Sequence, residues 1–388
     1  MTMPEYPEKI RVLHVYRTYF PDTQGGGEEV IRQVCHNTRA FNIESRVFTL
    51  SKQPSPTPLA REEALVFQGK RHLEVASCGI SFSALSAFRE LAAWADILHY
   101  HFPWPYGDLL HLLGGEATHK PTVINYHSDV VRQRALYFFY RPLMGRFLAR
   151  VDRIVATSPN YVASSALLSR HQDKVCVIPI GLDQAKIPAA NPELVARYRR
   201  DHGDNFLFFV GVFRYYKGLR FLLEAAAATR ANIVIAGSGP EEQSLKSYAS
   251  RHRLANVRFV GRISDEEKMS YLAACRALAF PSHLPSESFG ISLLEAALQG
   301  KPMISCEIGT GTSYVNIDGE TGLVIPPANP EALARAMNAL ADDGALAQRL
   351  GANARSRYED LFTGAAMGKQ YADLYHSLLL ANPESARR

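Results

Sequence analysis

The chain has 388 residues, of which 47% are hydrophobic and 21% charged, a composition typical of a soluble enzyme large enough for two domains. Its net charge of +5 suits anionic small substrates or an anionic membrane surface, and no long Lys/Arg run favours nucleic acid as a partner. The five cysteines are scattered without a C-x-x-C pair, so we expect neither a disulfide framework nor a thiolate zinc site. No apolar run approaches about 18 residues and no apolar signal core opens the chain, which predicts a cytoplasmic protein, at most peripheral on the inner face of a membrane.

Short runs of β-branched and aromatic residues alternate with helical stretches along the first half of the chain. The expected strands are 11–16, 97–100, 122–126, 154–156 and 175–178, and the first expected helix is 28–39. Strands that are apolar on both faces and alternate with helices form parallel sheets covered by helices. This half therefore predicts a doubly wound α/β domain.

The second half repeats the same pattern after a break. The expected strands are 206–210, 233–236, 257–260, 277–280 and 302–305, and the expected helices are 192–202, 218–229, 240–252 and 264–275. The break follows Asp183, where Pro188 and Pro192 interrupt the pattern. We expect two Rossmann-like domains facing each other across a cleft. The first is 1–183, with a C-terminal helix within 365–388 returning to it, and the second is 184–364.

The most informative segment is 287–295, which reads ESFGISLLE and follows the expected strand 277–280. Its second part begins a helix that Gly300 is placed to end. A helix N-terminus gathers free backbone N–H groups and the positive end of a dipole, which suits a phosphate. We place Glu287 before the helix and Glu295 about two turns inside it, so the two carboxylates could meet groups on either side of a bound phosphate. A nucleotide-sugar has that layout; the alternative is two solvated glutamates.

Three glycines, Gly25, Gly26 and Gly27, open the helix that follows the first strand. Without side chains they let a ligand approach the backbone, and the helix N-terminus favours an anion. The run is not G-x-G-x-x-G, which disfavours a dinucleotide redox site. The alternative is a tight turn that binds nothing.

Polar and charged side chains follow other strands where ligands of such sheets bind, beyond the carboxyl ends. Arg214 and Lys217 follow the strand 206–210 and could neutralise a diphosphate, unless they belong to a solvated basic loop. His101 lies at the end of one strand of the first domain, and His127 and Asp129 follow the next. A structural role for these histidines stays open beside a catalytic one.

The stretch 132–153 combines six arginines with interleaved tyrosines and phenylalanines and almost no acidic residue. Such a surface could lie on anionic lipid. Pro142 is expected to interrupt any long helix here. The alternative is an ordinary core helix with solvated arginines.

Taken in order, these motifs resemble the retaining glycosyltransferases of family 4, which have the GT-B architecture of two facing Rossmann-like domains. The resemblance covers nearly the whole chain, from the glycine loop through the His-Ser-Asp strand end, 157–159, 178–181 and 236–240 to the segment 287–295, which is the most specific part. It implies that Glu287 touches donor sugar hydroxyls, that Glu295 meets the ribose and that Lys217 stabilises the leaving phosphate. It further implies the following assignments: Ser288, Phe289, Gly290, Ile291 and Gly26 at the donor, mostly through backbone N–H groups; Gly261, Arg262 and Ile263 beside the base; Arg214 and His127 in catalysis; Gly25, Gly27, His101 and Asp129 at the acceptor.

The chain departs from the family pattern at one position. Many members carry an arginine directly after the glycine that ends the first strand of the second domain, where this chain has Val212. Arg214, two residues later, could supply the same guanidinium. The phrases 214–218 and 126–133 look like bacterial mannosyl- and rhamnosyltransferases of surface-polysaccharide (O-antigen, lipopolysaccharide) assembly.

The resemblance implies a retaining transfer of a hexose, mannose or rhamnose, from GDP-mannose or GDP-rhamnose to a hydroxyl of a glycan or lipid-linked acceptor. No Asp-x-Asp motif is present, so we expect no metal and no other cofactor. Two alternatives stay open at this point. One is a nucleotide-sugar epimerase of the same two-domain shape, and the other is a non-catalytic nucleotide-binding or scaffolding protein.

Overall fold

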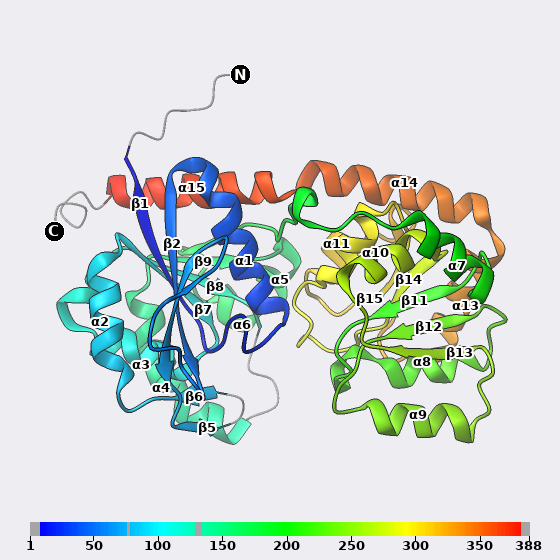
Figure 1. Ribbon diagram of the computed structural model, residues 1–388, viewed down its shortest axis with the longest axis horizontal. Coiled ribbons are helices and arrows are strands. Elements are labelled where there is room, and N and C mark those ends of the chain that lie inside the picture. The colour runs from blue at the N-terminus through cyan, green and yellow to red at the C-terminus, as the bar shows by residue number, and fades with distance from the viewer. Residues whose placement is uncertain (1–7, 76–77, 129–133, 382–388) are drawn as a thin grey trace. The chain divides into compact units, whose positions relative to one another are not determined.

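A computed structural model describes residues 8–75, 78–128 and 134–381 (Figure 1). The chain forms two compact units. The N-terminal unit comprises Met1–Thr157, Ser165–Gly181 and Gly364–Arg388, and the C-terminal unit comprises Ser158–Ser164 and Leu182–Thr363. Within the described ranges, no helix combines the length and the apolar character that crossing a membrane requires.

The N-terminal unit is built on an eight-stranded sheet in the order β10-β9-β8-β7-β1-β2-β4-β3, parallel throughout except for the short β3. A separate hairpin pairs β5 with β6. The strands are β1 Ile10–Val15, β2 Ile43–Ser51, β3 Leu59–Ala60, β4 Leu65–Lys70, β5 Leu73–Val75, β6 Cys78–Ile80, β7 Ile97–Phe102, β8 Thr122–Tyr126, β9 Arg153–Ala156 and β10 Val175–Val177. The helices are α1 Gly26–Thr38, α2 Ala84–Trp94, α3 Pro105–Leu113, α4 Arg134–Arg150, α6 Ala166–Ser169 and α15 Gly364–Ala381, with short 3-10 turns at Arg39–Phe41 and Gly115–Thr118.

The last helix of the chain, α15, packs on α1 and on the sheet of the N-terminal unit. Tyr371 donates a hydrogen bond of 2.6 Å from its hydroxyl to Asn125 Oδ1 on β8. At Gly368 an added Cβ would lie 2.5 Å from a backbone oxygen of α1, so only glycine allows this close approach. Burial of Tyr371 and Tyr375 stabilises the contact by roughly 1.5–3 kcal/mol for each side chain.

The C-terminal unit is built on a fully parallel six-stranded sheet in the order β13-β12-β11-β14-β15-β16. Helices cover both faces of this sheet (Figure 1). The strands are β11 Leu207–Val210, β12 Ile233–Ala236, β13 Val257–Gly261, β14 Ala277–Phe280, β15 Met303–Cys306 and β16 Gly322–Ile325. The helices are α5 Pro159–Ser164, α7 Pro192–His202, α8 Leu219–Ala226, α9 Glu242–Arg251, α10 Asp265–Ala274, α11 Ile291–Leu298, α12 Thr312–Val315, α13 Pro330–Asp342 and α14 Gly344–Leu361, with 3-10 turns at Gln184–Lys186 and Tyr215–Lys217.

The predicted α/β class with parallel, doubly wound sheets is confirmed in both units. Strands β2 to β6 and β16 were not predicted. The expectation that Pro142 interrupts any long helix is wrong, because α4 continues through it. Buried Met144, Phe147 and Leu148 hold the part of α4 after the proline, and Lys174 Nζ donates to backbone oxygens at its C-terminal end. These contacts outweigh the local cost of the proline.

Each sheet reverses its strand order at one place. In the N-terminal unit β2 lies on one side of β1 and β7 on the other. In the C-terminal unit β12 lies on one side of β11 and β14 on the other. Ligands of open α/β sheets bind beyond the carboxyl ends of the strands at such switch points. A ligand site is therefore expected in the segments after β1 and β7 and in those after β11 and β14.

Candidate functional site

In the C-terminal unit, the segments after β11 and β14 bring Lys217 and Glu287 together. Lys217 Nζ lies 2.5 Å from Glu287 Oε2, and the hydroxyl of Ser282 donates a 3.0 Å hydrogen bond to the same oxygen. The two charged side chains are 14% and 11% exposed. Both were predicted from the sequence as candidate catalytic residues, and the structure places them in contact at the switch point of the sheet.

The backbone around this pair is constrained. Gly218 has φ +70°, and an added Cβ would lie 1.9 Å from the backbone oxygen of Pro281. Only glycine therefore lets the segment after β11 pack this closely against the segment after β14. On the other side, Thr310 Oγ1 donates a 2.8 Å hydrogen bond to the carbonyl oxygen of Glu287. The positions of Lys217 and Glu287 are thus fixed by contacts among the segments that follow β11, β14 and β15.

Helix α11 begins directly after the pair. Gly290 is its N-cap residue at φ +90° and has no side chain to cap the first turn, so the free N–H groups of that turn can serve an anion. Phe289 is 1% exposed and packs on Phe362, so only its backbone can serve a ligand, whereas Ser288 and Ile291 are half-buried. Glu295 lies about one turn inside the helix, rather than the two turns predicted, because the helix begins at Ile291.

The second carboxylate of the motif is anchored by a lysine. Lys268 Nζ on α10 lies 2.7 Å from Glu295 and 2.8 Å from Asp265. Burial by itself would lower the pKa of the Lys268 ammonium, but the two carboxylates outweigh burial and raise this pKa above its ordinary value. Lys268 therefore fixes the position of the Glu295 carboxylate.

The other predicted donor residues lie on the same unit. Arg214 is exposed, and its side chain has no hydrogen-bond or ion-pair partner among the residues that the structure describes. Gly261 ends β13 at φ +74°, the exposed Arg262 donates from Nε to Ser238 Oγ at 2.6 Å, and Ile263 is half-buried. Because β13 pairs with β12 and β12 pairs with β11, all in parallel, these residues follow strands at the same edge of the sheet.

In the N-terminal unit, helix α1 begins at Gly26 with Gly25 as its N-cap residue. The Glu28 carboxylate is 7% exposed and accepts hydrogen bonds from Thr18 and Thr23 hydroxyls at 2.8 and 2.7 Å. A Cβ at Gly25 would lie 2.8 Å from this carboxylate. An anion bound at the start of α1, as the sequence predicted, would be repelled by the Glu28 carboxylate. The start of α1 therefore suits a ligand with hydroxyl groups better than an anion.

The third glycine, Gly27, leaves room for a tyrosine. A Cβ at this position would lie 2.6 Å from the hydroxyl oxygen of Tyr16, which follows β1. The Tyr16 ring in turn packs on the rings of His101 and His127, with ring centres 5.8 Å apart in both cases. Tyr16 therefore joins the glycine loop to the histidines at the ends of β7 and β8.

His127 follows β8 and is half-buried. Burial, and secondly the nearby Arg17 guanidinium, lowers the pKa of His127 to about 4, so the ring is neutral at neutral pH. His101 is 1% exposed, and its two ring nitrogens face His14 and His127 at 3.1 and 3.0 Å. His101 thus has no free nitrogen to offer the predicted acceptor. Asp129 lies outside the described residues.

Several residues that contact the predicted site residues were not predicted from the sequence. Ser282 and Lys268 touch the two carboxylates of the 287–295 segment, and Glu28 and Tyr16 flank the glycine loop. Ser282, Glu28 and Tyr16 could have been found, because they follow strand ends or the glycines directly. Nothing in the sequence pairs Lys268 with Glu295, since that contact depends on how α10 and α11 pack.

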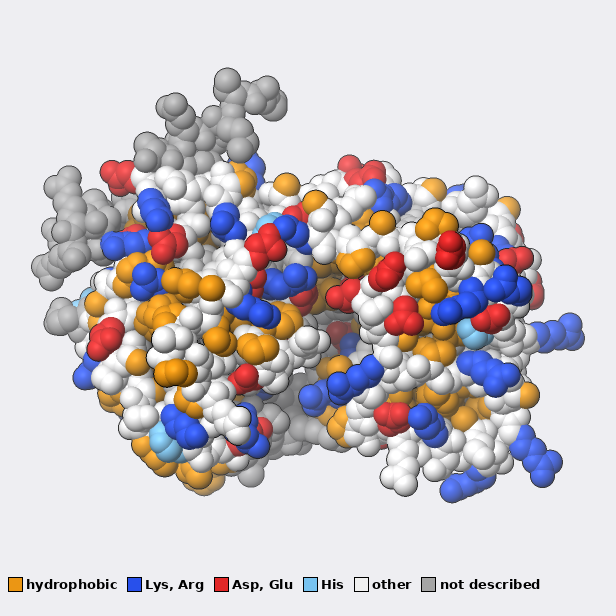
Figure 2. Space-filling view, in the orientation of Figure 1, with side chains coloured by type: hydrophobic (Ala, Val, Ile, Leu, Met, Phe, Trp, Pro, Cys, Tyr) orange, Lys and Arg blue, Asp and Glu red, His pale blue; other side chains and the backbone are white. Residues whose placement is uncertain are grey.

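Charged side chains of both signs are interspersed over the face of the molecule shown in Figure 2. This distribution matches the modest net charge of +5. The visible face does not carry the continuous basic stripe that is typical of a nucleic-acid-binding surface.

Two doubly wound units of this kind are the architecture of the GT-B fold class. Similar folds support this class: sucrose-phosphate synthase from Thermosynechococcus elongatus matches with a TM-score of 0.81 at 21% identity, covering 96% of this chain and 100% of that one. Alr3699/HepE from Anabaena, in complex with UDP and glucose, matches with a TM-score of 0.77 at 18% identity, covering 95% and 100%.

Sequence comparisons give the family. The profile described as Glycosyltransferase Family 4 matches residues 24–186, and the profile described as Glycosyl transferases group 1 matches residues 191–357. D-rhamnosyltransferase WbpZ of Pseudomonas aeruginosa is 49% identical over 354 residues, which cover 91% of this chain and 92% of that protein. O-antigen chain mannosyltransferase C of Escherichia coli is 47% identical over 370 residues, which cover 95% and 99%. The chain belongs to glycosyltransferase family 4.

The predicted family and enzyme class are therefore confirmed. The alternative of a nucleotide-sugar epimerase is not supported, because the related proteins named here are sugar transferases. The alternative of a non-catalytic scaffold is likewise set aside in favour of an enzyme.

Proposed function

We propose that this glycosyltransferase moves mannose or rhamnose, with retention of configuration, from a GDP-linked donor to a hydroxyl of a glycan or lipid-linked acceptor during synthesis of a cell-surface polysaccharide. The observation that carries the proposal is the Lys217–Glu287 pair beside the uncapped start of α11. The named activities of the two relatives at 49% and 47% identity support the sugar and the pathway. The UDP and glucose bound in a protein of similar fold support a nucleotide-sugar as donor.

The donor diphosphate would bind the free N–H groups at the start of α11 and the ammonium of Lys217. Glu287 would accept hydrogen bonds from the donor sugar, and Glu295 from the ribose. Sugar transfer passes through an oxocarbenium-like state while negative charge grows on the leaving diphosphate. Lys217, the exposed Arg214 and the helix dipole would stabilise that charge, so we propose that no metal is needed for its departure.

Glu287 also has a role before the donor arrives. It neutralises Lys217 in the free protein, with Nζ and Oε2 at 2.5 Å. The incoming diphosphate would then compete for the same ammonium, and the released carboxylate oxygen would turn to the sugar hydroxyls. The leaving diphosphate would take up the proton of the incoming acceptor hydroxyl, so no side-chain base is required in this scheme.

The N-terminal unit would serve the acceptor and the donor sugar. The missing side chains of Gly25 and Gly27 make room for the Glu28 carboxylate and the Tyr16 hydroxyl, and the buried Glu28 would accept hydrogen bonds from hydroxyl groups of the ligand. His127, half-buried at the end of β8, supplies a neutral ring nitrogen at the same place.

Calorimetric titration with GDP, UDP and ADP tests the base. We expect GDP to bind most tightly, by about one to two orders of magnitude, because an unpaired buried polar group in a mismatched base pocket costs roughly 1–3 kcal/mol. The variant Glu295→Gln serves as a control, because it should weaken all three ligands alike through their common ribose. Tighter binding of UDP would overturn the guanine assignment and leave the family untouched.

A lipid-linked acceptor would bring the N-terminal unit to a membrane, and we propose that α4 contacts it. Phe138 and Phe139 are 73% and 79% exposed on this helix, and Arg141 and Arg146 are exposed beside them. Aromatic and cationic side chains on one helix suit an anionic lipid surface. Arg132, at the start of the predicted stretch, lies outside the described residues.

Co-sedimentation with liposomes, with and without anionic lipid, tests this contact. We expect binding that needs anionic lipid and weakens in the Phe138→Ser/Phe139→Ser variant. Arg141→Ala/Arg146→Ala should also weaken it, whereas Arg199→Ala/Arg200→Ala, the same charge change on α7, should not. No binding at low salt would leave α4 as a solvated arginine-rich face.

A further inference from the structure

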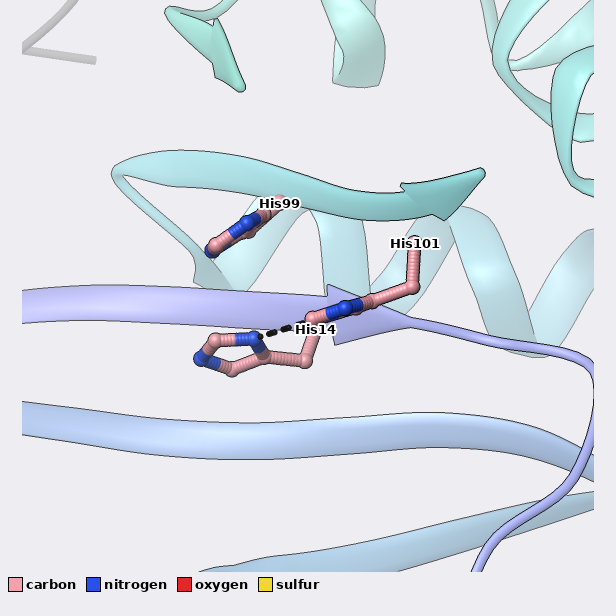
Figure 3. A group of neighbouring side chains, drawn as sticks. All are labelled: His14, His99 and His101. Atoms are coloured by element: carbon pink, nitrogen blue, oxygen red, sulfur yellow. Dashed lines mark hydrogen bonds between the residues drawn. The ribbon is translucent and has the colours of Figure 1, made fainter. Parts of the chain in front are cut away.

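Histidines from adjacent strands form a hydrogen-bonded chain inside the N-terminal unit. His14 lies on β1, and His99 and His101 lie on β7, with their rings gathered on one face of the sheet (Figure 3). His14 Nδ1 lies 3.1 Å from His101 Nε2, and His101 Nδ1 lies 3.0 Å from His127 Nε2. The chain thus runs from the fully buried His14 to His127, which is half-buried at the end of β8.

The three hydrogen-bonded rings, those of His14, His101 and His127, are neutral near neutral pH. Burial lowers the pKa of His14 to about 3 and of His127 to about 4, and it holds the pKa of His101 well below its ordinary value. A neutral imidazole has one N–H donor and one acceptor nitrogen. Each of the two contacts must therefore pair an N–H with a lone pair, and the protons can be arranged in only two ways.

In the first arrangement every ring carries its proton on Nδ1. His14 then donates to His101, His101 donates to His127, and the proton of His127 is on the nitrogen that faces away from the chain. In the second arrangement every ring carries its proton on Nε2, the hydrogen bonds run inward, and the outer nitrogen of His127 is a bare acceptor. His127 therefore presents a hydrogen-bond donor in the first arrangement and a hydrogen-bond acceptor in the second.

The inner end of the chain decides between them. His14 Nε2 is buried and has no hydrogen-bond partner among the described residues. In the second arrangement this atom would be an unpaired buried N–H, whereas in the first it is an unpaired lone pair. A buried N–H group without a partner is rarer than a buried acceptor without one. The first arrangement is therefore favoured.

The same histidines could be taken for a metal site, because His14, His99 and His101 each offer a nitrogen and these atoms lie within 4.8 Å of one another. However, both nitrogens of His101 are engaged in the chain, and His99 Nδ1 lies 2.7 Å from the Tyr375 hydroxyl. Two nitrogens remain free, on His14 and His99, and a closed structural zinc site takes four ligands. The hydrogen-bonded chain accounts for more of the contacts than a metal does.

We infer that His101 and His14 are positioning residues that hold the His127 proton on Nδ1, so that this ring presents a hydrogen-bond donor to the ligand. The identity of that ligand rests on the proposed function: a donor at this place would serve an oxygen of the sugar or of the diphosphate. It follows that His127 does not act as a general base through Nδ1, since the tautomer held by His101 has no lone pair there.

Nitrogen NMR of the histidine rings tests the tautomer directly. In protein labelled with ring-¹⁵N histidine, the His127 signals are identified by their loss in the His127→Gln variant. We expect a protonated Nδ1 and a bare Nε2 for His127. A proton on Nε2, or a bound metal in stoichiometric amount in the purified protein, would overturn the inference.

Two variants of similar size at His101 test the positioning. His101→Asn keeps an amide N–H near the position of Nδ1 and should keep the His127 proton on Nδ1. His101→Asp, once ionised, only accepts and should move that proton to Nε2. We expect kcat of the Asp variant to fall about 10- to 100-fold below that of the Asn variant, with KM for the donor changed much less. This factor corresponds to the loss of one hydrogen bond from His127 to a charged oxygen.

Identical His127 tautomers in the two variants would overturn the inference. If the Asp variant does not fold, the spectrum of the wild-type protein still decides the matter. The tautomer is measured without any donor, so a failure to find transfer from GDP-sugars would refute the proposed function and leave this result standing.

Discussion

Replacing Lys217 by methionine should separate the structural from the catalytic role of the Lys217–Glu287 pair. The change removes the ammonium that lies 2.5 Å from Glu287 and leaves this carboxylate, 11% exposed, with the Ser282 hydroxyl at 3.0 Å. Removing one partner of a buried ion pair costs roughly 3–5 kcal/mol of unfolding free energy. Loss of one donor to a developing negative charge costs about 2.7–4 kcal/mol in the transition state, a fall in kcat of about 10²–10³.

The double variant Lys217→Met/Glu287→Gln makes the two effects diverge. With both charges gone no ion is left unpaired, so most of the lost stability should return. Activity should not return, because neither the diphosphate nor the sugar regains its partner. Glu287→Gln alone should nearly abolish transfer while the protein stays folded, since the residue contacts the ligand and not the hydrophobic core.

Urea unfolding and steady-state transfer at saturating donor measure the two effects. Lys369→Met is a suitable control, since it breaks an exposed ion pair with Asp373 on α15 and should change neither quantity much. The reasoning is refuted if Lys217→Met keeps kcat within about threefold of wild type. It also fails if the double variant is as unstable as the single one.

Three further predictions concern single positions. Arg214→Ala should lower kcat more than donor affinity without lowering stability, since this exposed side chain has no partner in the described chain; rates equal to wild type would show that it does not stabilise the diphosphate. Gly218→Ala should unfold more readily and lose activity, because its Cβ would lie 1.9 Å from a backbone carbonyl oxygen. The control Gly319→Ala, also at φ +70° but with open space around the added Cβ, should show only the milder backbone strain. Equal losses of stability in the two variants would contradict this reasoning. Stability should fall as the pH drops from about 7 to about 5, by up to about 1.4 kcal/mol per pH unit for each buried histidine, and His14→Asn should flatten that slope.

The sign of this pH effect follows from the direction of the shifts. The folded-state pKa values of His14 and His127, about 3 and about 4, lie below the ordinary value of 6.5. The unfolded chain therefore binds protons first as the pH falls, and stability is lost from about pH 6.5 downward. A slope in His14→Asn as steep as in the wild type would contradict the assignment of His14 as a buried neutral ring.

The parallel sheets could be predicted because their strands are continuous apolar runs. The prediction of 277–280 coincides with β14, whose four residues are all buried. Strand β2 was missed because its sequence, IESRVFTLS, mixes polar with apolar residues. Helix α4 shows tertiary packing overriding a local rule, since the buried side chains after Pro142 hold the helix together.

The same division applies to the site. Lys217 and Glu287 could be predicted as partners of one ligand because both follow strands whose carboxyl ends share an edge of the sheet. The His14–His101 contact could not, because it joins residues 87 positions apart and depends on the pairing of β1 with β7. The contact of Lys268 with Glu295 likewise depends on the packing of two helices.

The central claim is that the chain transfers a hexose from a GDP-linked donor with retention. The most direct measurement follows GDP-mannose and GDP-rhamnose by NMR, each with purified protein and a lipid-linked glycan acceptor, and determines the anomeric configuration of the product. We predict that one of these donors releases GDP only when the acceptor is present, and that the new linkage keeps the α configuration of the donor. Release of no GDP from either donor, conversion of a donor without acceptor, or a β-linked product would contradict the account.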